Sequence, residues 1–543
     1  MTQNDRRGGG GVAGGGGAAG RGGAGARGGT GARGGAPSGG QRPGVRSGRP
    51  GTGPLGAAGS GGPRERRKPP TDPARRVAFD VLQAVTNSDS YANLVLPVML
   101  RERQITGRDA AFATELAYGV LRAKGSYEAI TAASLSRGLD ATDPAVIDVL
   151  SLGVHQLLAT RVPDHAAISA TVELAREVRG EGAASLVNAV LRRVVEGGDL
   201  HTWLERVAPP IEVDLLSHLS VTLSHPRWII EALGNSLRVQ AQLSGAPAPG
   251  DAELIEALTA DNVAPHVTLT ARPGQAELEE LLAPVEGRPG ATVGRWSPYA
   301  AVLSSGGDPG AVLAVREGRA GVQDEGSQLV ALLLAGAPLV GSDRAWLDLC
   351  AGPGGKAALL AAVAAARGAR VVAVELQPHR ARLVRSALSA TELRHPGTTV
   401  TVVADGTSAP VAPGSMDRVL VDAPCTGLGA LRRRPEARWR RTPGDVGGLL
   451  KLQGALLRSA LDAVRPGGVV AYATCSPHVA ETRGVLLDVL SRRTDVTELD
   501  TAELLDAMSL APMPGARAGN AVQLWPHRHG TDAMFIALLR KDV

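Results

Sequence analysis

From residue 316 to the C-terminus, the chain repeats one order of segments: an apolar strand, a short turn and then often a helix. The apolar runs end in polar residues, as in "AWLDLC" (345–350), "RVVAVE" (370–375), "VTVVAD" (400–405), "RVLVDAP" (418–424) and "GVVAYATCS" (468–476). Stretches of helical period separate some of them. Alternating strands and helices predict an α/β domain over 316–543, with a mostly parallel sheet and functional sites where its strands end.

Residues 71–205 have a different pattern, with apolar residues at helical spacing and no strand-like alternation. The first of these segments offers Thr71 as the N-cap and Pro73 in the first turn. Its apolar positions are Val77, Val81, Leu82 and Val85. Gly, Pro and Asp separate further segments of the same kind. This pattern predicts a compact all-α domain.

Residues 206–315 are mixed in character. The stretch 212–234 has a helical pattern, whereas "HVTLTA" (266–271) and "AVLAVREG" (311–318) are typical of short strands. We therefore expect a small α+β module that links the helical domain to the α/β domain.

Residues 1–70 are rich in glycine and arginine, with 27 glycines and repeated "RGG". Such a segment has little apolar surface to bury, so we expect it to be disordered. It holds 12 Lys or Arg against 2 Asp or Glu, so the net charge of +5 belongs to this tail and the remaining chain is mildly acidic. Such a tail either raises the encounter rate with RNA or only keeps the protein in solution.

The composition also limits the class of protein. The longest apolar run, about 329–340, is too short to cross a bilayer, and no secretory signal opens the chain. Three cysteines without CxxC spacing indicate neither a disulfide framework nor a zinc site, so no metal is expected. We expect a cytoplasmic protein without membrane contact, acting as a monomer.

The turn "LDLCAGPGGK" (347–356) joins a strand to a helix and resembles a cofactor-binding turn. It does not fit a P-loop, but Gly352, Gly354 and Ala357 fit the GxGxxG/A frame, which also occurs where glycines serve packing alone. The next strand ends in Glu375, an acceptor for a ribose diol, and the following one in Asp405, which suits an adenine amino group. These acceptors favour S-adenosylmethionine and leave NAD open.

Cys425 and Cys475 each follow a strand end, beside a proline. A single cysteine is more often a small buried hydrophobe, but two at neighbouring strand ends favour a chemical role. Carbon 5 of cytosine becomes nucleophilic when a thiolate adds to carbon 6, and a second group must then assist release of the thiolate. A carboxyl group near ring nitrogen 3, which Asp422 could supply, would favour the addition. Chemistry alone does not choose which thiol adds.

These motifs, "DLCAGPGGK", "MDRVLVDAPCTG" and "YATCSP", resemble those of the RNA cytosine-5 methyltransferases of the Nol/Nop/Sun (Fmu) group. Residues 71–200 resemble the NusB-type RNA-binding domain that is fused to such enzymes in the bacterial RsmB group. Together the resemblances cover roughly residues 71–543, and they imply a Rossmann-like class I methyltransferase fold. Gly352 stands where the family usually has alanine, and the glycine-rich tail is not part of the family pattern.

The resemblance also implies a role for each site residue. Cys475 would add to carbon 6, Cys425 would assist product release and Asp422 would contact the base. The S-adenosylmethionine pocket would be formed by Cys350, Ala351, Gly352, Pro353, Gly354, Gly355, Lys356, Glu375, Asp405 and Asp422. The substrate implied is RNA, and 16S ribosomal RNA or a small-subunit precursor in particular.

An arginine-rich stretch and a histidine lie close to the two cysteines in the sequence. The arginine-rich stretch "RRRPEARWRR" (432–441) is either an RNA-contacting loop or a solvated charge run, and its place just after Cys425 favours RNA. His478 is more often structural than catalytic at such a place. The rival functions are a methyltransferase of another acceptor (tRNA, DNA, protein or a small molecule), a non-catalytic NusB-like RNA-binding or antitermination factor, and a nicotinamide oxidoreductase.

Overall fold

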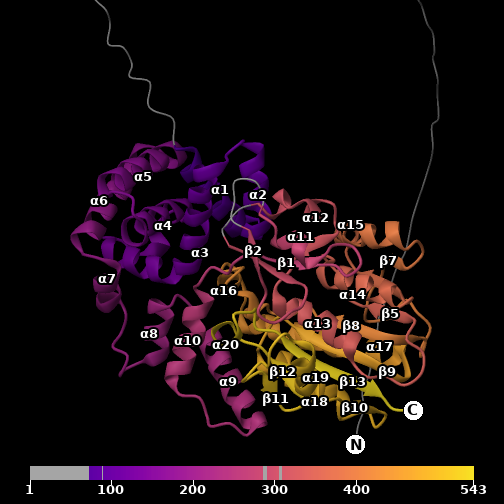
Figure 1. Cartoon of the computed structure of the whole chain (residues 1–543). Helices are drawn as coiled ribbons and strands as arrows, with labels where there is room; N and C mark the ends of the chain where they lie inside the picture. The colour runs from indigo at the N-terminus through magenta and orange to yellow at the C-terminus, as the bar shows by residue number, and fades with distance from the viewer. Residues whose placement is uncertain (1–71, 89, 285–289, 305–307) are drawn as a thin grey trace, which may run out of the picture. The chain divides into compact units, whose positions relative to one another are not determined.

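The computed structural model describes residues 72–543, except residue 89 and the segments 285–289 and 305–307. The predicted disordered tail, residues 1–70, lies outside these described residues. All the described residues fall within a single unit of contacts, Pro69–Val543 (Figure 1).

The first part of this unit is helical, as predicted. Its helices, in the part of the chain that is described, are α1 (Pro73–Asn87), α2 (Ala92–Glu102), α3 (Gly107–Ser134), α4 (Pro144–Ala159), α5 (Asp164–Arg179), α6 (Glu181–Glu196) and α7 (Leu200–Val207). They enclose one apolar core, to which Val77, Val81, Leu82 and Val85 contribute as predicted. The first helix is capped by Asp72, whose carboxylate accepts the Arg75 amide at 3.0 Å, so the expectation of a Thr71 cap was wrong.

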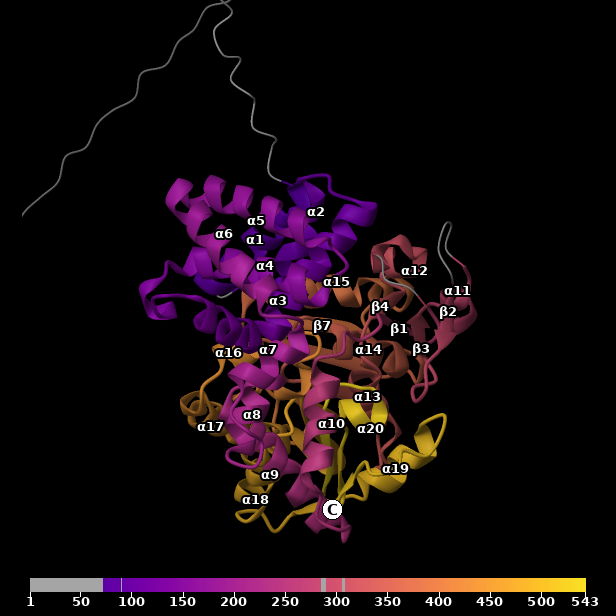
Figure 2. The same ribbon diagram turned by 90° about the vertical axis from the view of Figure 1, so that its left-hand side faces the viewer.

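Three helices follow, α8 (Leu215–Thr222), α9 (Arg227–Ser244) and α10 (Asp251–Asp261). Figures 1 and 2 both show them below the helical core, where α8 contacts α3 and α9 contacts a strand at the edge of the large sheet. Their shared apolar core includes Ile229, Leu233 and Leu258. They thus connect the first helices to the α/β part of the chain.

A small antiparallel sheet comes next, in the order β2-β3-β1-β4. Its strands are β1 (Thr268–Ala271), β2 (Ala291–Val293), β3 (Ala300–Leu303) and β4 (Ala320–Val322), with the short helix α11 (Leu278–Leu282) after β1. The predicted boundary at residue 315 therefore falls between β3 and β4, and the domain boundaries stay predictions.

The stretch 311–318 was expected to be a strand, and this expectation was wrong. It contains the end of the turn η2 (Pro309–Ala311) and the helix α12 (Leu313–Arg316), which buries Ala314 and ends before Gly318. A short apolar run has the same appearance in a buried strand and in one helical turn, so periodicity could not separate them.

The large sheet has nine strands in the described residues, in the order β11-β12-β13-β9-β8-β5-β6-β7, with β10 paired to β13. The strands are β5 (Ala345–Asp348), β6 (Arg370–Glu375), β7 (Thr399–Val403), β8 (Met416–Asp422), β9 (Val464–Thr474), β10 (Val496–Glu498), β11 (Arg517–Ala518), β12 (Ala521–Gln523) and β13 (Phe535–Lys541). Strands β5 to β9 are parallel, and β13 runs antiparallel to β9. The predicted mostly parallel α/β fold is confirmed.

Helices cover both faces of this sheet. One apolar core joins α13 (Glu325–Gly336), α14 (Gly355–Ala366), α15 (Pro378–Arg394) and α19 (Thr501–Met508) to one face. A second core joins α17 (Pro443–Ala463) and α18 (Arg483–Leu490) to the other. Trp346 points to the first core and its neighbour Leu347 to the second, as the alternation of side chains along a strand requires.

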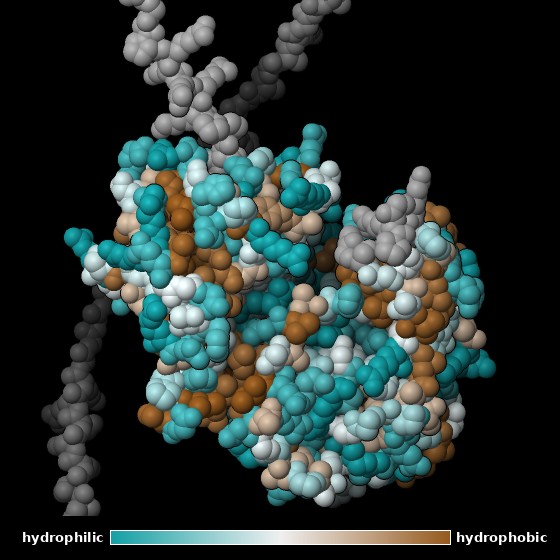
Figure 3. All heavy atoms as spheres, turned by 60° about the vertical axis from the view of Figure 1, so that its left-hand side comes forward, coloured by the Kyte–Doolittle hydropathy of each residue, from teal (hydrophilic) through white to brown (hydrophobic). Residues whose placement is uncertain are grey.

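Within the described residues, no helix combines the length and the apolar character that crossing a membrane requires. Figure 3 shows one face of the molecule, where apolar side chains form separate patches among hydrophilic ones.

Candidate active site

The carboxyl ends of β5 and β8 meet at the centre of the large sheet. The chain passes from β5 to β6 on one side, whereas β8 pairs with β5 on the other, so the strand order reverses at this point. A reversal of strand order opens a crevice beyond the strand ends. Asp348 is the last residue of β5 and Asp422 the last of β8, so two carboxylates stand at this place.

The glycine turn after β5 lies against the end of β6. The Gly352 amide donates to Glu375 Oε2 at 3.1 Å, and a Cβ built on Gly352 would lie 2.1 Å from the same oxygen. An alanine at this position would therefore require Glu375 to move. Gly354, the N-cap residue just before α14, has φ +117°, in the region that favours glycine.

Glu375 is buried at the end of β6. Its carboxylate accepts the amides of Gly352 and of Gln377, at 3.1 and 2.9 Å, and lies 3.6 Å from Arg380 Nη1. Each carboxylate oxygen has two lone pairs, so the group keeps acceptor capacity for a ribose hydroxyl. The position is the one predicted for a cofactor acceptor.

Asp405 is exposed, two residues beyond β7. Its carboxylate accepts from the Thr407 amide at 2.9 Å and from the Thr407 hydroxyl at 2.8 Å. The loop itself lies close to the glycine turn, since a Cβ on Gly406 would come within 2.7 Å of the Leu349 carbonyl oxygen. The neighbouring residues Gly406 and Thr407 thus hold Asp405 beside the glycine turn.

Lys356, at the start of α14, joins the glycine turn to the end of β8. Its Nζ lies 2.9 Å from Asp422 Oδ2. Burial alone would lower the pKa of Lys356, but the Asp422 carboxylate and hydrogen bond raise it. The ammonium group therefore stays charged next to Asp422.

Asp348 is fully buried beside this ion pair, and sequence reasoning did not single it out. Burial and then the charge of Asp422 raise the pKa of Asp348 to about 7. Its Oδ1 accepts the Cys350 amide at 3.2 Å, and its Oδ2 has no hydrogen-bond partner. Its place at the last position of the strand before a glycine turn could have identified it.

Replacing Asp348 by Asn should stabilise the protein more at pH 8 than at pH 5. A carboxyl whose pKa is raised on folding keeps its proton in the folded protein between about pH 4 and 7, so its contribution to stability falls as the pH rises through that range. The gain over wild type should grow by up to roughly 3 kcal/mol, at 1.36 kcal/mol per unit. Urea unfolding at both pH values measures it.

The exposed Asp140 provides the matched control, because a substitution at a surface position such as Asp140→Asn should change the free energy of unfolding by no more than about 0.5 kcal/mol. A gain for Asp348→Asn that is the same at pH 5 and pH 8 would contradict the assignment of a raised pKa.

Cys425 and Cys475 follow the ends of the adjacent strands β8 and β9. Their sulfur atoms lie 3.4 Å apart, within hydrogen-bonding distance. The hydrogen bond with Cys425 lowers the pKa of the Cys475 thiol, with a further contribution from Lys356, while the same bond and burial raise the pKa of Cys425. Cys475 is therefore the easier of the two thiols to ionise, and a proton can be shared between the two sulfur atoms.

Cys350 is the third thiol, in the glycine turn. Burial raises the pKa of Cys350 well above its ordinary value, and the nearby carboxylates raise it further. Its amide, and not its sulfur, is engaged by Asp348. The structure thus separates Cys350 from the reactive pair.

Comparison with known proteins supports a common family. Residues 338–540 match the family model described as 16S rRNA methyltransferase RsmB/F, and residues 72–196 match the NusB family. A methyltransferase of Mycobacterium tuberculosis is 52% identical over 88% of this chain and 99% of its own. The ribosomal RNA small subunit methyltransferase B of Pseudomonas putida is 32% identical over 86% of this chain and 98% of its own. The chain belongs to the RsmB/F methyltransferase family.

One solved structure, that of the protein PH0851, shares the fold. It aligns with a TM-score of 0.69 at 20% identity and covers 87% of this chain and 99% of its own. The family models and the curated relatives confirm the resemblance seen in the sequence motifs and the NusB-like helices. This RsmB/F protein belongs to the S-adenosylmethionine-dependent RNA methyltransferases. The nicotinamide alternative has no support from the family.

The arginine-rich stretch 432–441 of this RsmB/F protein is mostly internal, so its interpretation as an RNA-contacting loop was wrong for most of its arginines. Arg432 and Arg433 form ion pairs with Asp324 and Asp532, at 2.6 to 3.0 Å. These pairs fix the chain just after the cysteine turn to α13 and to the loop before β13. The stretch therefore has a structural role in this region.

The rest of the stretch contacts the helical region. Arg438 is fully buried, Arg440 donates to the Val85 and Ser90 carbonyl oxygens, and Trp439 packs on Gly125 of α3. Arg434 remains exposed and lies over the ring of Tyr91, 5.3 Å from its centroid. Of these arginines, Arg434 stays available to a substrate, and its charge also lowers the pKa of Cys475.

His478 has a structural role here. Its Nδ1 accepts the Ala480 amide at 3.2 Å and caps the turn η4 (Val479–Glu481), and burial lowers its pKa. Sequence reasoning also missed Glu481, which is fully buried behind the two cysteines. Its only signal in the sequence is a carboxylate six residues after Cys475.

Proposed function

We propose that this protein transfers a methyl group from S-adenosylmethionine to carbon 5 of a cytidine in 16S ribosomal RNA. The observation that carries the proposal is the pair of thiols, 3.4 Å apart, beside the Lys356–Asp422 ion pair at the reversal of strand order. Methyl transfer to an oxygen or nitrogen acceptor needs no thiol. Methylation of a carbon atom in a pyrimidine ring needs a nucleophile that adds to the ring and later leaves.

In this proposal Cys475 is the nucleophile. Its lowered pKa favours the thiolate, which would add to carbon 6 of a cytosine that has been turned out of the RNA stack. Asp422 would contact the base near ring nitrogen 3, held in place by Lys356 at 2.9 Å. The addition leaves carbon 5 as the nucleophilic carbon of an enamine.

The glycine turn Cys350–Lys356, with Glu375, Asp405 and Asp422, would hold the cofactor. When bound, S-adenosylmethionine supplies the electrophilic methyl group that carbon 5 accepts. Two observations support the fit: Gly352 gives the backbone no Cβ at the turn, and Asp348 has a buried carboxylate oxygen without a partner. A buried polar atom of this kind needs a hydrogen-bond partner, which a polar group of a bound ligand would supply.

Cys425 would assist product release. After methyl transfer, carbon 5 must lose its proton so that the ring can expel the Cys475 thiolate. Cys425 has a raised pKa and lies 3.4 Å from Cys475, so it would give its proton to the leaving sulfur and, as the thiolate, take the proton that carbon 5 loses. The roles of the two thiols come from the resemblance, and the lowered pKa of Cys475 supports them.

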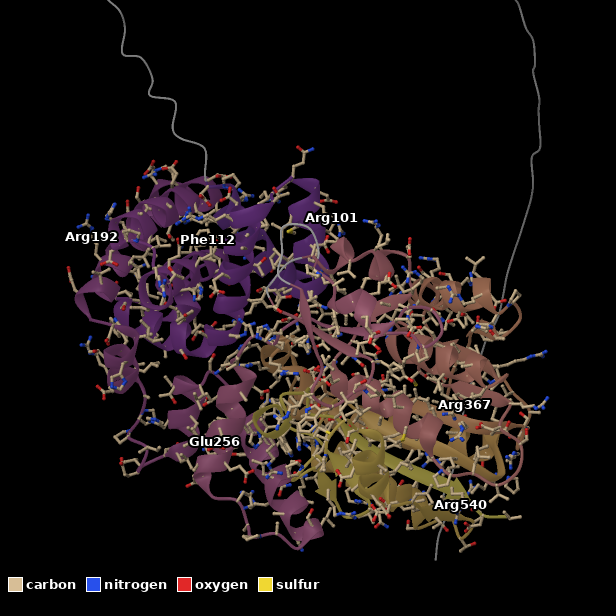
Figure 4. All side chains as sticks on the ribbon, viewed as in Figure 1. Arg101, Phe112, Arg192, Glu256, Arg367 and Arg540 are labelled. Atoms are coloured by element: carbon tan, nitrogen blue, oxygen red, sulfur yellow. The ribbon has the colours of Figure 1, made fainter. Side chains whose placement is uncertain are left out.

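RNA would be positioned by the helical region. Arg101 and Arg192 point outward from α2 and α6 in Figure 4, and both are exposed. Exposed arginines attract phosphates without reading the sequence. The reducing cytoplasm, where ribosomes are made, would keep Cys425 and Cys475 as free thiols.

The decisive experiment supplies the full-length protein with labelled S-adenosylmethionine and small-subunit ribosomal RNA, and then digests the RNA to nucleosides. We expect the label in 5-methylcytidine, and none with Cys475→Ala. Label in another nucleoside or in protein would assign a different acceptor. RNA binding without any label would indicate a non-catalytic factor, so either result would overturn the proposal.

A further inference from the structure

Glu481 is a buried carboxylate shared by the two cysteine loops. Thr426 follows Cys425 and Ser476 follows Cys475, and the side chains of both donate to Glu481. The Thr426 hydroxyl lies 2.5 Å and the Ser476 hydroxyl 2.7 Å from Oε2, while the Thr426 amide lies 2.8 Å from Oε1. The Glu481 carboxylate therefore links the two residues that follow Cys425 and Cys475.

Other elements fix this carboxylate. Gln453 of α17 donates to Glu481 Oε1 at 3.1 Å and to the Pro424 carbonyl oxygen at 2.8 Å, just before Cys425. The Tyr472 hydroxyl, on β9, donates to the Glu481 carbonyl oxygen at 2.7 Å. Glu481 is thus tied to the sheet, to α17 and to both loops.

Burying the Glu481 carboxylate costs free energy, and packing alone does not explain why a charged side chain occupies this position. A carboxylate with no exposed surface loses its hydration, and it is tolerated only when donors surround it. Here four donors converge on its two oxygens, and three of them belong to Thr426 and Ser476, the residues next to the two thiols. A hydrophobic side chain could fill the same space, but it could not fix the position of either loop.

We propose that Glu481 is a positioning residue that holds Cys425 and Cys475 in register, so that a proton can pass between their sulfur atoms. This inference rests on the proposed function for its consequence in turnover, but its geometric claim concerns the thiols alone. The Cys425 thiol gives its proton to the leaving Cys475 sulfur and, as the thiolate, takes the proton that carbon 5 loses. The first of these transfers requires the distance near 3.4 Å that the shared carboxylate maintains. Glu481 itself acts through Thr426 and Ser476 and does not contact the base.

Thiol alkylation by iodoacetamide tests this directly, without RNA. The rate for Cys475 is followed against pH by mass spectrometry in wild type, Glu481→Ala, Thr426→Val and Ser476→Ala. Cys475 also faces Asp422, Lys356 and Arg434, which none of these variants changes. If the two cysteine loops lose their register, the hydrogen bond between the two thiols weakens. The midpoint of the pH dependence of Cys475 alkylation should then rise by about one pH unit.

Turnover is the second readout. If register is lost, kcat for methyl transfer should fall about tenfold to a hundredfold, with KM for RNA and for S-adenosylmethionine within about twofold of wild type. The exposed Glu503, in the first turn of α19, gives the control variant Glu503→Ala, which should change neither readout.

An unchanged alkylation midpoint in both Thr426→Val and Ser476→Ala would overturn the inference, even if Glu481→Ala lowers the thermal stability. These two variants keep the carboxylate and test the loops if Glu481→Ala fails to fold. A shifted midpoint in a protein that methylates no RNA would support the positioning role and refute the proposed function instead.

Discussion

Cys425→Ala should remain covalently attached to its RNA, whereas Cys475→Ala should form no adduct. Without the Cys425 thiol, the Cys475 sulfur adds to carbon 6 and is not released, so RNA-linked protein accumulates. Without the Cys475 thiol, the ring is never activated, and methyl transfer should fall by at least about a thousandfold. Incubation with S-adenosylmethionine and small-subunit ribosomal RNA, followed by a denaturing gel, measures both.

Glu503→Ala, at an exposed position in the first turn of α19 and outside the site, is the control. It should show no RNA-linked band, and its Cys475 should still react. A band for Cys475→Ala alone would reverse the two roles. The absence of a band from both variants would contradict the assignment of this RNA as the substrate.

Arg438→Ala should lower the free energy of unfolding by about 4 kcal/mol, because it leaves buried acceptors without a donor. The Arg438 guanidinium donates to the carbonyl oxygens of Arg122, Ser224 and Asp261 and to the Asn262 side chain, at 2.7 to 3.1 Å. Burial lowers its pKa to about 10, so it stays protonated at neutral pH. Urea unfolding followed by circular dichroism measures the loss.

Two variants separate the causes. Arg438→Met keeps most of the volume and removes the donors, so it should lose most of the same free energy. Arg385→Ala, at an exposed position on α15, should stay within about 0.5 kcal/mol of wild type. A loss below about 1 kcal/mol for Arg438→Ala would show that this arginine does not hold the surrounding elements together.

The large sheet could be predicted from sequence because its strands are short apolar runs that end in polar residues, each followed by a turn. The same sequence pattern predicted that Glu375, Asp422, Cys425 and Cys475 lie at strand ends. It failed at 311–318, where one helical turn buries the same kind of residues as a strand. It failed again at 432–441, because a run of arginines has the same composition whether its partners are phosphates or internal carboxylates.

The helical core was predictable for a related reason. Val77, Val81, Leu82 and Val85 repeat at helical spacing, and that spacing alone places them on one buried face. The N-cap residue of α1 was not predictable in this way, because it depends on which of two adjacent residues accepts a free amide of the first turn. In the structure the Asp72 carboxylate accepts the Arg75 amide.

The sequence by itself determined the strand–turn–helix order, the glycine turn and the presence of two thiols at strand ends, because each depends on residues close together in the chain. Tertiary structure alone decided the contacts between distant segments. These are the 3.4 Å between Cys425 and Cys475, the burial of Asp348 beside Asp422, and the partners of Glu481 and Arg438. The physical reason is that charge and hydrogen bonding depend on distance and burial, which only the packed sheet and helices set.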